Sequence, residues 1–409
     1  MRPVTAILLG TALLASPVTA LAARPALAVS ADFPGGSVHV DELDQEARAI
    51  RVQPADHPGR GWRCWWYFKV TGIEPGETLT VSVSGGGFAL PDRAAFSLDG
   101  VAWKHTSPGR REKGKVTYAV RVDAREAYVA WGPPYLPLHA RDLIARAVKA
   151  CPRAKAFDLC RTREDRPTPA LRIEPDDAQA ERPILLWVQA RQHAWESGSS
   201  WVCEGLVRWL CSDDARANAL RRRCRIVAVP IMDIDNVVRG AGGKNQNPQD
   251  HNRDWSDQPH WRAVAAAQRM LREMNDAARL TLFIDLHNPG PGPRDQEVFF
   301  YTCPLAGLSE GRRTLLDAFL AAAKAEMAAP LGFRGQTRES GPGYDRNWER
   351  ISKNWVADHL DGPVIAVTME TGWNTPHSTQ ANYQEVGRRL GLAVERHLGR
   401  PAGAGTAAP

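Results

Sequence analysis

A proline-rich stretch at residues 132–137 separates two parts of the chain that have different sequence patterns. From about residue 32 to residue 131, short runs of β-branched and aromatic residues alternate with Gly, Pro and Asp clusters. After Leu138, apolar runs of strand length alternate with segments of helical length. We therefore expect a small antiparallel β-sandwich at residues 32–135, followed by an α/β domain with a mixed sheet at residues 138–400.

The second part of the chain carries its polar motifs just after its apolar runs. Strands are expected at 184–188, 226–229, 280–284, 298–301 and 364–368, and helices at 140–150, 201–210, 261–277, 308–327 and 379–398. Open α/β sheets place their sites at the carboxyl ends of their strands. A functional site is therefore expected at that edge of the sheet, and residues 401–409 are expected to form a flexible tail.

The first 28 residues have the pattern of a signal peptide. Arg2 is followed by an apolar run at residues 4–14, and small-x-small motifs end at Ala22 and Ala28. We expect cleavage after residue 22 or 28 and export to the periplasm or the medium. The apolar run is too short to favour a membrane anchor.

Charge and cysteine content narrow the class of protein. The net charge is +6, but no basic-aromatic recognition pattern accompanies it, so nucleic-acid binding is not expected. Export permits disulfides among the seven cysteines, with Cys151–Cys160 the most plausible local pair and Cys203, Cys211 or Cys224 in a second. No C-x-x-C spacing occurs, which argues against a cysteine zinc site.

His193 and Glu196 lie three residues apart, after the predicted strand 184–188. Such a pair on a turn can bind one metal ion, and a catalytic zinc takes three protein ligands. His287 is the expected third ligand because it ends an apolar strand, and Asp285 or another carboxylate is expected to orient a ligand imidazole. Taken alone, the H-x-x-E pattern also fits an exposed His beside a helix-capping Glu.

Two further motifs suggest peptide chemistry. Asn252 and Arg253 follow a long polar loop, and an Arg there can bind a carboxylate with two hydrogen bonds, although a solvated turn is the alternative. Glu370 ends the apolar strand at 364–368. Burial there would raise its pKa and suit a general base, whereas a Glu facing water is the alternative.

The order of these motifs resembles the zinc metallocarboxypeptidases of the carboxypeptidase A superfamily, most closely their cytosolic carboxypeptidase branch. The similar segments are 65–70, 192–201, 229–237, 250–255 and 285–287, and the resemblance covers residues 33–398. It implies a mixed-sheet zinc carboxypeptidase domain preceded by the β-sandwich. The sequence departs from that branch at Ala194-Trp195, where the branch has Pro-Gly.

The resemblance implies a role for each matching residue. One Zn²⁺ per chain is held by His193, Glu196 and His287. Glu370 takes a proton from the attacking water and delivers it to the leaving amine. Asn252 and Arg253 hold the terminal carboxylate of a peptide or protein substrate.

Three family positions are matched less closely. Arg239 and Lys244 compete for the cation that polarises the scissile carbonyl, and Lys244 has the nearer spacing. Tyr344 matches a family Tyr on a loop with a shift of about two residues, and a loop aromatic without chemistry is the alternative. Lys353, two residues before Trp355, matches the base of the pocket for the terminal side chain. A cation there favours a C-terminal Glu or Asp, unless Lys353 points to solvent.

The resulting hypothesis is an exported zinc metallocarboxypeptidase with a possible preference for C-terminal Glu or Asp. One alternative is a zinc amidase or de-acylase on the same scaffold that acts on cell-wall peptides or N-acyl amino acids. The other is a non-catalytic binding relative. The complete ligand set together with Glu370 disfavours this last alternative.

Overall fold

The structure is a computed structural model that describes residues 24–175, 182–290, 297–328 and 330–399. The predicted tail and the predicted leader up to residue 23 lie outside the described residues. Leu27 is buried in the sandwich core and β1 begins at Ala28, so a cut after residue 28 would remove a core side chain. Within the described residues, no helix has the length and apolarity needed to cross a membrane.

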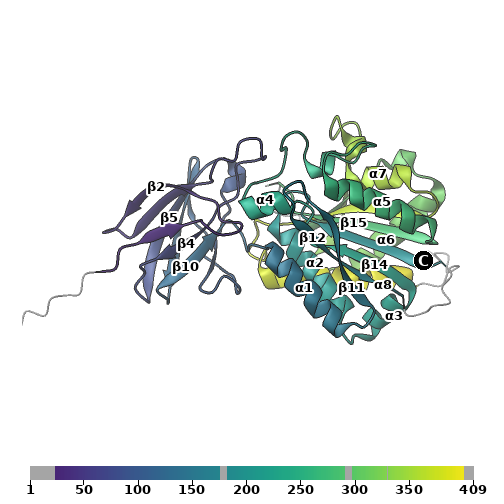
Figure 1. Cartoon of the computed structure of the whole chain (residues 1–409), viewed down its shortest axis with the longest axis horizontal. Helices are drawn as coiled ribbons and strands as arrows, with labels where there is room; N and C mark the ends of the chain where they lie inside the picture. The colour runs from purple at the N-terminus through teal and green to yellow at the C-terminus, as the bar shows by residue number, and fades with distance from the viewer. Residues whose placement is uncertain (1–23, 176–181, 291–296, 329, 400–409) are drawn as a thin grey trace, which may run out of the picture.

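The first domain consists of two stacked sheets of five strands each (Figure 1). One sheet has the order β1 (Ala28–Ser30), β4 (Tyr67–Thr71), β10 (Glu126–Ala130), β6 (Ala95–Ser97), β7 (Lys104–His105). The other has the order β2 (His39–Asp44), β3 (Ala49–Gln53), β5 (Glu77–Ser84), β9 (Lys115–Val122), β8 (Arg110–Glu112). The predicted antiparallel sandwich is confirmed, with the exception that β3 and β5 pair in parallel.

The second domain is built on the predicted mixed sheet, which has eight strands. Its order is β11 (Ala154–Arg161), β12 (Pro167–Ile173), β14 (Cys224–Val229), β13 (Ile184–Ala190), β15 (Leu280–His287), β18 (Val364–Thr371), β16 (Val298–Thr302), β17 (Phe333–Glu339). The central strands β14, β13, β15 and β18 run parallel. They are buried on both sides, so their sequences are almost continuously apolar.

Helices cover both faces of this sheet (Figure 1). One face packs on α1 (Pro137–Ala150), α2 (Ser197–Leu210), α3 (Ala215–Arg223), α4 (Ile234–Arg239), α6 (Glu310–Glu326) and α8 (Gln380–Leu398). The other packs on α5 (Arg262–Asp276) and α7 (Ser352–His359). Side chains of β13 alternate between the two cores: Leu186 and Val188 face α2 and α8, whereas Leu185 and Trp187 face α5 and α7.

The register of the parallel strands brings distant polar residues to one edge of the sheet. Ala190 at the end of β13 pairs with Leu286 of β15, and His287 pairs with Glu370 of β18. Residues that lie far apart in sequence therefore meet at the carboxyl ends of three neighbouring strands, where the sequence placed the site.

The predicted Cys151–Cys160 disulfide is wrong in this structure, where both cysteines are free. Cys160 lies on β11, with its Sγ 3.6 Å from Thr168 Oγ1 on β12. Cys151 ends α1 in the core on the other side of the sheet. The residues between them form the start of β11, which extends the chain instead of folding it back.

Candidate metal and peptide site

The turn after β13 is held by a buried arginine. Arg191 has a positive φ of 64° and is almost fully buried. Its Nε donates to Ala194 O at 2.7 Å, and Nη1 donates to Tyr135 O at 3.2 Å. Because this guanidinium bonds both to its own turn and to Tyr135 in the stretch that joins the two domains, the turn carrying His193 and Glu196 is fixed before α2 begins at Ser197.

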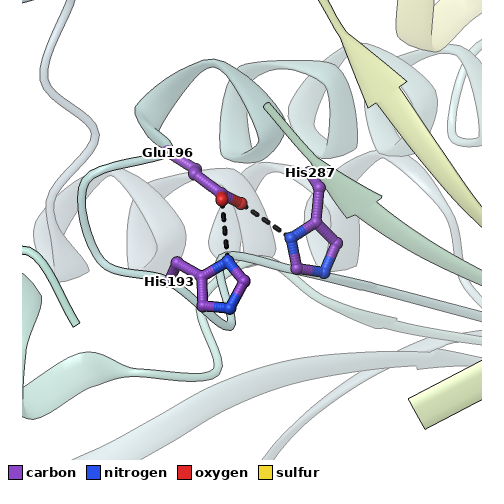
Figure 2. A group of neighbouring side chains, drawn as sticks. All are labelled: His193, Glu196 and His287. Carbon is purple, nitrogen blue, oxygen red and sulfur yellow. Dashed lines mark hydrogen bonds and ion pairs between the residues drawn. The ribbon is translucent and has the colours of Figure 1, made fainter. Parts of the chain in front are cut away.

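Three buried side chains from this turn and from the end of β15 point at one another (Figure 2). His193 Nδ1 lies 2.7 Å from Glu196 Oε1, and His287 Nδ1 lies 2.8 Å from Glu196 Oε2. One ligand atom from each residue lies within 4.8 Å of the others. Two imidazole nitrogens and a carboxylate are a ligand set found at catalytic zinc sites, so these residues fit Zn²⁺.

Each histidine contacts a carboxylate through its other ring nitrogen. His287 Nε2 lies 3.0 Å from Asp285 Oδ2, the contact expected from the sequence, and His193 Nε2 lies 3.6 Å from Asp250 Oδ1. Carboxylates in these positions fix the ring orientation of metal-binding histidines. Burial alone would lower the pKa of His287, but Asp285 and Glu196 outweigh burial and raise that pKa.

Glu196 and Glu370 are both buried, but their pKa values are shifted in opposite directions. Burial would raise the pKa of Glu196, but the two histidines outweigh it and lower the pKa. For Glu370, burial raises the pKa to about 8, with His287 opposing this shift. Glu370 Oε2 is buried and has no hydrogen-bond partner among the described residues. A carboxylate that is free to exchange a proton beside a metal site suits a general base.

The two candidates for the cation that polarises the scissile carbonyl, Lys244 and Arg239, lie in different places in the structure. Lys244 borders the same cavity as His193 and Glu370, and its Nζ lies 3.0 Å from Asp250 Oδ2. Arg239 ends α4, and its guanidinium is ion-paired with Glu164 at 2.7 Å. Arg239 is absent from the residues that line the cavity in the described parts of the chain.

Asn252 and Arg253 lie on a 3-10 turn, His251–Arg253, beside the metal-binding residues. Asn252 Nδ2 lies 3.3 Å from His287 Nε2, and Asn252 Oδ1 accepts from Ser352 N at 3.0 Å. Arg253 Nε donates to Asp345 Oδ2 at 2.9 Å, and Nη1 donates to Asn252 O. The remaining N–H groups of Arg253 can still bind a substrate carboxylate.

Lys353 is buried at the first turn of α7 and does not point to solvent. Its Nζ donates to Ser340 Oγ and Asn354 Oδ1, both at 2.5 Å. Burial lowers the pKa of Lys353 to about 8. No carboxylate of the described residues lies within ion-pair distance of this ammonium, so its bonded partners are neutral.

One cavity of about 120 Å³ collects these residues. Its lining includes the predicted residues His193, Glu196, Lys244, Asn252, Arg253, His287, Tyr344, Lys353 and Glu370. Tyr344 lies on a loop with 48% of its surface exposed, and its ring lies 5.8 Å from the Arg253 guanidinium. The structure therefore brings together every predicted site residue except Arg239.

Sequence reasoning missed several contributors to this site. Asp250 lies two residues before Asn252 in the Asp-His-Asn-Arg motif. Its place in that motif was the sequence signal that could have identified it as a site residue. Thr368, on β18, lines the cavity and has a buried hydroxyl without a partner among the described residues. Trp62 reaches the cavity from the sandwich, and no sequence signal linked it to the site.

Comparison with known proteins agrees with this geometry. Residues 141–287 match the Peptidase_M14 family, described as zinc carboxypeptidase. An uncharacterized protein of Zymomonas mobilis is 26% identical over 268 residues, covering 64% of this chain and 67% of that protein. Cytosolic carboxypeptidase 2 of Danio rerio is 25% identical over 272 residues, covering 58% of this chain but only 37% of its own length.

A solved structure has the same fold over nearly the whole chain. The metallo-carboxypeptidase from Burkholderia cenocepacia superposes with a TM-score of 0.77 at 21% identity. The match covers 91% of this chain and 99% of that one, so it includes both domains.

Proposed function

We propose that this chain, which carries a zinc carboxypeptidase domain of the Peptidase_M14 family, is an exported enzyme that removes a C-terminal Glu or Asp from peptides. The observation that carries the proposal is the single cavity in which the His193, Glu196 and His287 set, Glu370 and Lys353 meet. It combines a zinc site, a proton-exchanging carboxylate and a buried cation.

The substrate is held at its terminal residue. Arg253, with Asn252 beside it, binds the terminal α-carboxylate. Lys353 Nζ and the free hydroxyl of Thr368 are the donors for a side-chain carboxylate. A bound Glu or Asp would give Lys353 the charged partner that the described residues do not give it.

Hydrolysis follows from the groups around the scissile bond. Zinc, when bound, supplies a Lewis acid that acidifies water and polarises a carbonyl. Glu370 removes a proton from the attacking water as the oxygen of that water bonds to the carbonyl carbon. Lys244 stabilises the negative charge that develops on the carbonyl oxygen. Glu370 then gives the proton to the leaving nitrogen as the C–N bond breaks.

A zinc amidase or de-acylase remains the second candidate, because Arg253 would equally hold an N-acyl amino acid by its carboxylate. An N-acyl amino acid ends in the same kind of residue as a peptide substrate. It differs only in the acyl group on the other side of the cleaved bond. Export is supported by the leader pattern of residues 1–28. N-terminal sequencing of protein recovered from the periplasm or medium tests export, and protein retained in the cytoplasm would contradict it.

A library of peptides that differ only in the last residue, combined with metal analysis of the same sample, tests the proposal. We expect about one zinc per chain and preferential release of Glu and Asp. The Glu370→Gln variant should keep its zinc and lose at least about 10²-fold in turnover, because the base is removed while the ligands remain. Release from N-acyl amino acids alone would favour the de-acylase, and zinc binding without any hydrolysis would favour a binding protein.

A further inference from the structure

Residues 59–62 form a loop of the sandwich that reaches the catalytic site, and we call it the bridging loop. Its backbone pairs with residues 243–247 of the second domain: Trp62 N donates to Lys244 O at 2.9 Å, Gly243 N donates to Arg60 O at 2.8 Å, and Asn247 N donates to Gly59 O at 2.7 Å. These bonds join the sandwich directly to the segment that carries Lys244.

The bridging loop and the segment that carries Lys244 approach each other so closely that neither Gly61 nor Gly242 has room for a side chain. A Cβ on Gly242 would lie 2.1 Å from Trp62 O, and a Cβ on Gly61 would lie 2.4 Å from Lys244 O. On its other side this segment contacts the metal-binding turn, because Trp195 N donates to Gly242 O at 3.1 Å. The bridging loop is therefore seated at a fixed position relative to the zinc ligands.

The Trp62 side chain enters the catalytic cavity from this loop. It lines the same cavity as His193, Glu196 and Glu370. Its ring lies 4.1 Å from that of Phe88 and 6.1 Å from that of Trp195, measured between centroids. Two aromatic rings thus pack against the indole, which remains partly exposed and lines the cavity.

The cavity has chemically different walls. Lys353, Ser340 and Thr368 form a polar wall that belongs to the second domain. Trp62 and Trp195, with Pro289 and Gly290 beside them, form an apolar wall, and Trp62 is the contribution of the sandwich. If the polar wall takes the terminal side chain, the apolar wall is available to the part of the peptide upstream of the cleaved bond.

We propose that Trp62 binds the side chain immediately upstream of the cleaved bond and favours an aromatic or large aliphatic residue there. The inference rests on the proposed function and extends it to a second substrate position. An indole that packs against Phe88 and Trp195 is pre-organised for an apolar or aromatic partner, so binding costs little side-chain entropy. The sandwich then acts as part of the substrate cleft.

The test uses amino-blocked peptides that end in Phe-Glu and Gly-Glu. The zinc-loaded wild type should cleave the Phe-Glu peptide with about tenfold higher kcat/KM. Trp62→Ala should reduce this ratio to about one while changing the Gly-Glu rate by less than about threefold, because the backbone N–H of residue 62 still bonds Lys244. Trp62→Phe should retain most of the preference.

Two controls distinguish an effect of the Trp62 indole on substrate preference from general effects of a substitution or of the terminal residue. Phe96→Ala removes an aromatic of β6 in the same domain and should leave the ratio unchanged. The same peptide pair ending in Leu makes the ratio independent of Lys353. An equal loss on both peptides in a folded, zinc-loaded Trp62→Ala, or a wild-type ratio near one, would overturn the inference alone. If the wild type cleaves none of the four peptides, the proposed function is wrong and the inference falls with it.

Discussion

Two lysines line the same cavity, but their surroundings differ. Lys244 Nζ lies 3.0 Å from Asp250 Oδ2, so its charge is already balanced. Lys353 is more deeply buried, and among the described residues its Nζ bonds only to Ser340 Oγ and Asn354 Oδ1. Burial lowers the pKa of Lys353 to about 8, which indicates how poorly these neutral partners stabilise its charge.

This difference indicates what each lysine contributes. A paired cation that polarises the scissile carbonyl would act on every substrate in the same way, because that carbonyl is common to all peptides. A buried cation without a charged partner is costly unless a ligand supplies the opposite charge. Lys244 is therefore expected to set the rate, and Lys353 the choice of substrate.

Replacing Lys244 should have a larger effect on activity than changing the charge of Lys353. Lys244→Ala removes a stabilising charge from the transition state and takes one of its partners from Asp250. Removal of one such group typically costs about 10²–10³ in kcat. We expect this loss in kcat for Glu-ending and Leu-ending peptides alike, measured by steady-state kinetics at saturating substrate.

Arg239→Ala is the matched control, because Arg239 is the competing family match and pairs with Glu164 away from the cavity. Its kcat should stay within about twofold of the wild type. A large loss in Arg239→Ala with little change in Lys244→Ala would reverse the assignment of the polarising cation.

The substrate preference should depend on pH through Lys353. In the free enzyme its ammonium is charged below its pKa of about 8 and neutral above it. Attraction for a terminal Glu is therefore present at lower pH and lost as the pH rises through about 8. Between pH 6.5 and 9.5 we expect the ratio of kcat/KM for Glu-ending over Leu-ending peptides to fall about tenfold.

Lys353→Met provides the reference for this pH profile, since it keeps much of the side-chain length without the titrating group. Its ratio should be flat over the same range. A wild-type ratio that does not change with pH, or one that rises, would mean that Lys353 does not contact the terminal side chain.

The parts of the site that could be predicted are those with a local signal. The strands that became β13, β15 and β18 are apolar runs ending in polar residues, so the positions of His193, His287 and Glu370 followed from the sequence. Strands β11, β12 and β17 were missed. β11 carries several exposed charged residues and lies at the edge of the sheet, where the pattern of a buried strand is absent.

The missed contributors depend on partners that lie far away in the chain. Asp250 contacts His193, and although Asp250 belongs to the Asp-His-Asn-Arg motif, that motif does not indicate which histidine it contacts. Trp195 stands where the similar branch has a small residue, and its ring packs beside Trp62 and Trp131 of the sandwich. Such roles are set by the packing of two domains, which local patterns do not encode.

The central claim, that Lys353 selects an acidic terminal residue at a zinc peptidase site, is tested most directly by Lys353→Ile. The measurement is kcat/KM for two peptides that differ only in ending with Glu or Leu, with zinc content determined in the same samples. The wild type should favour Glu by about 10²-fold, and the variant should keep its zinc, lose that preference and cleave the Leu peptide faster. A zinc-loaded variant with the same Glu-to-Leu ratio as the wild type would contradict the claim.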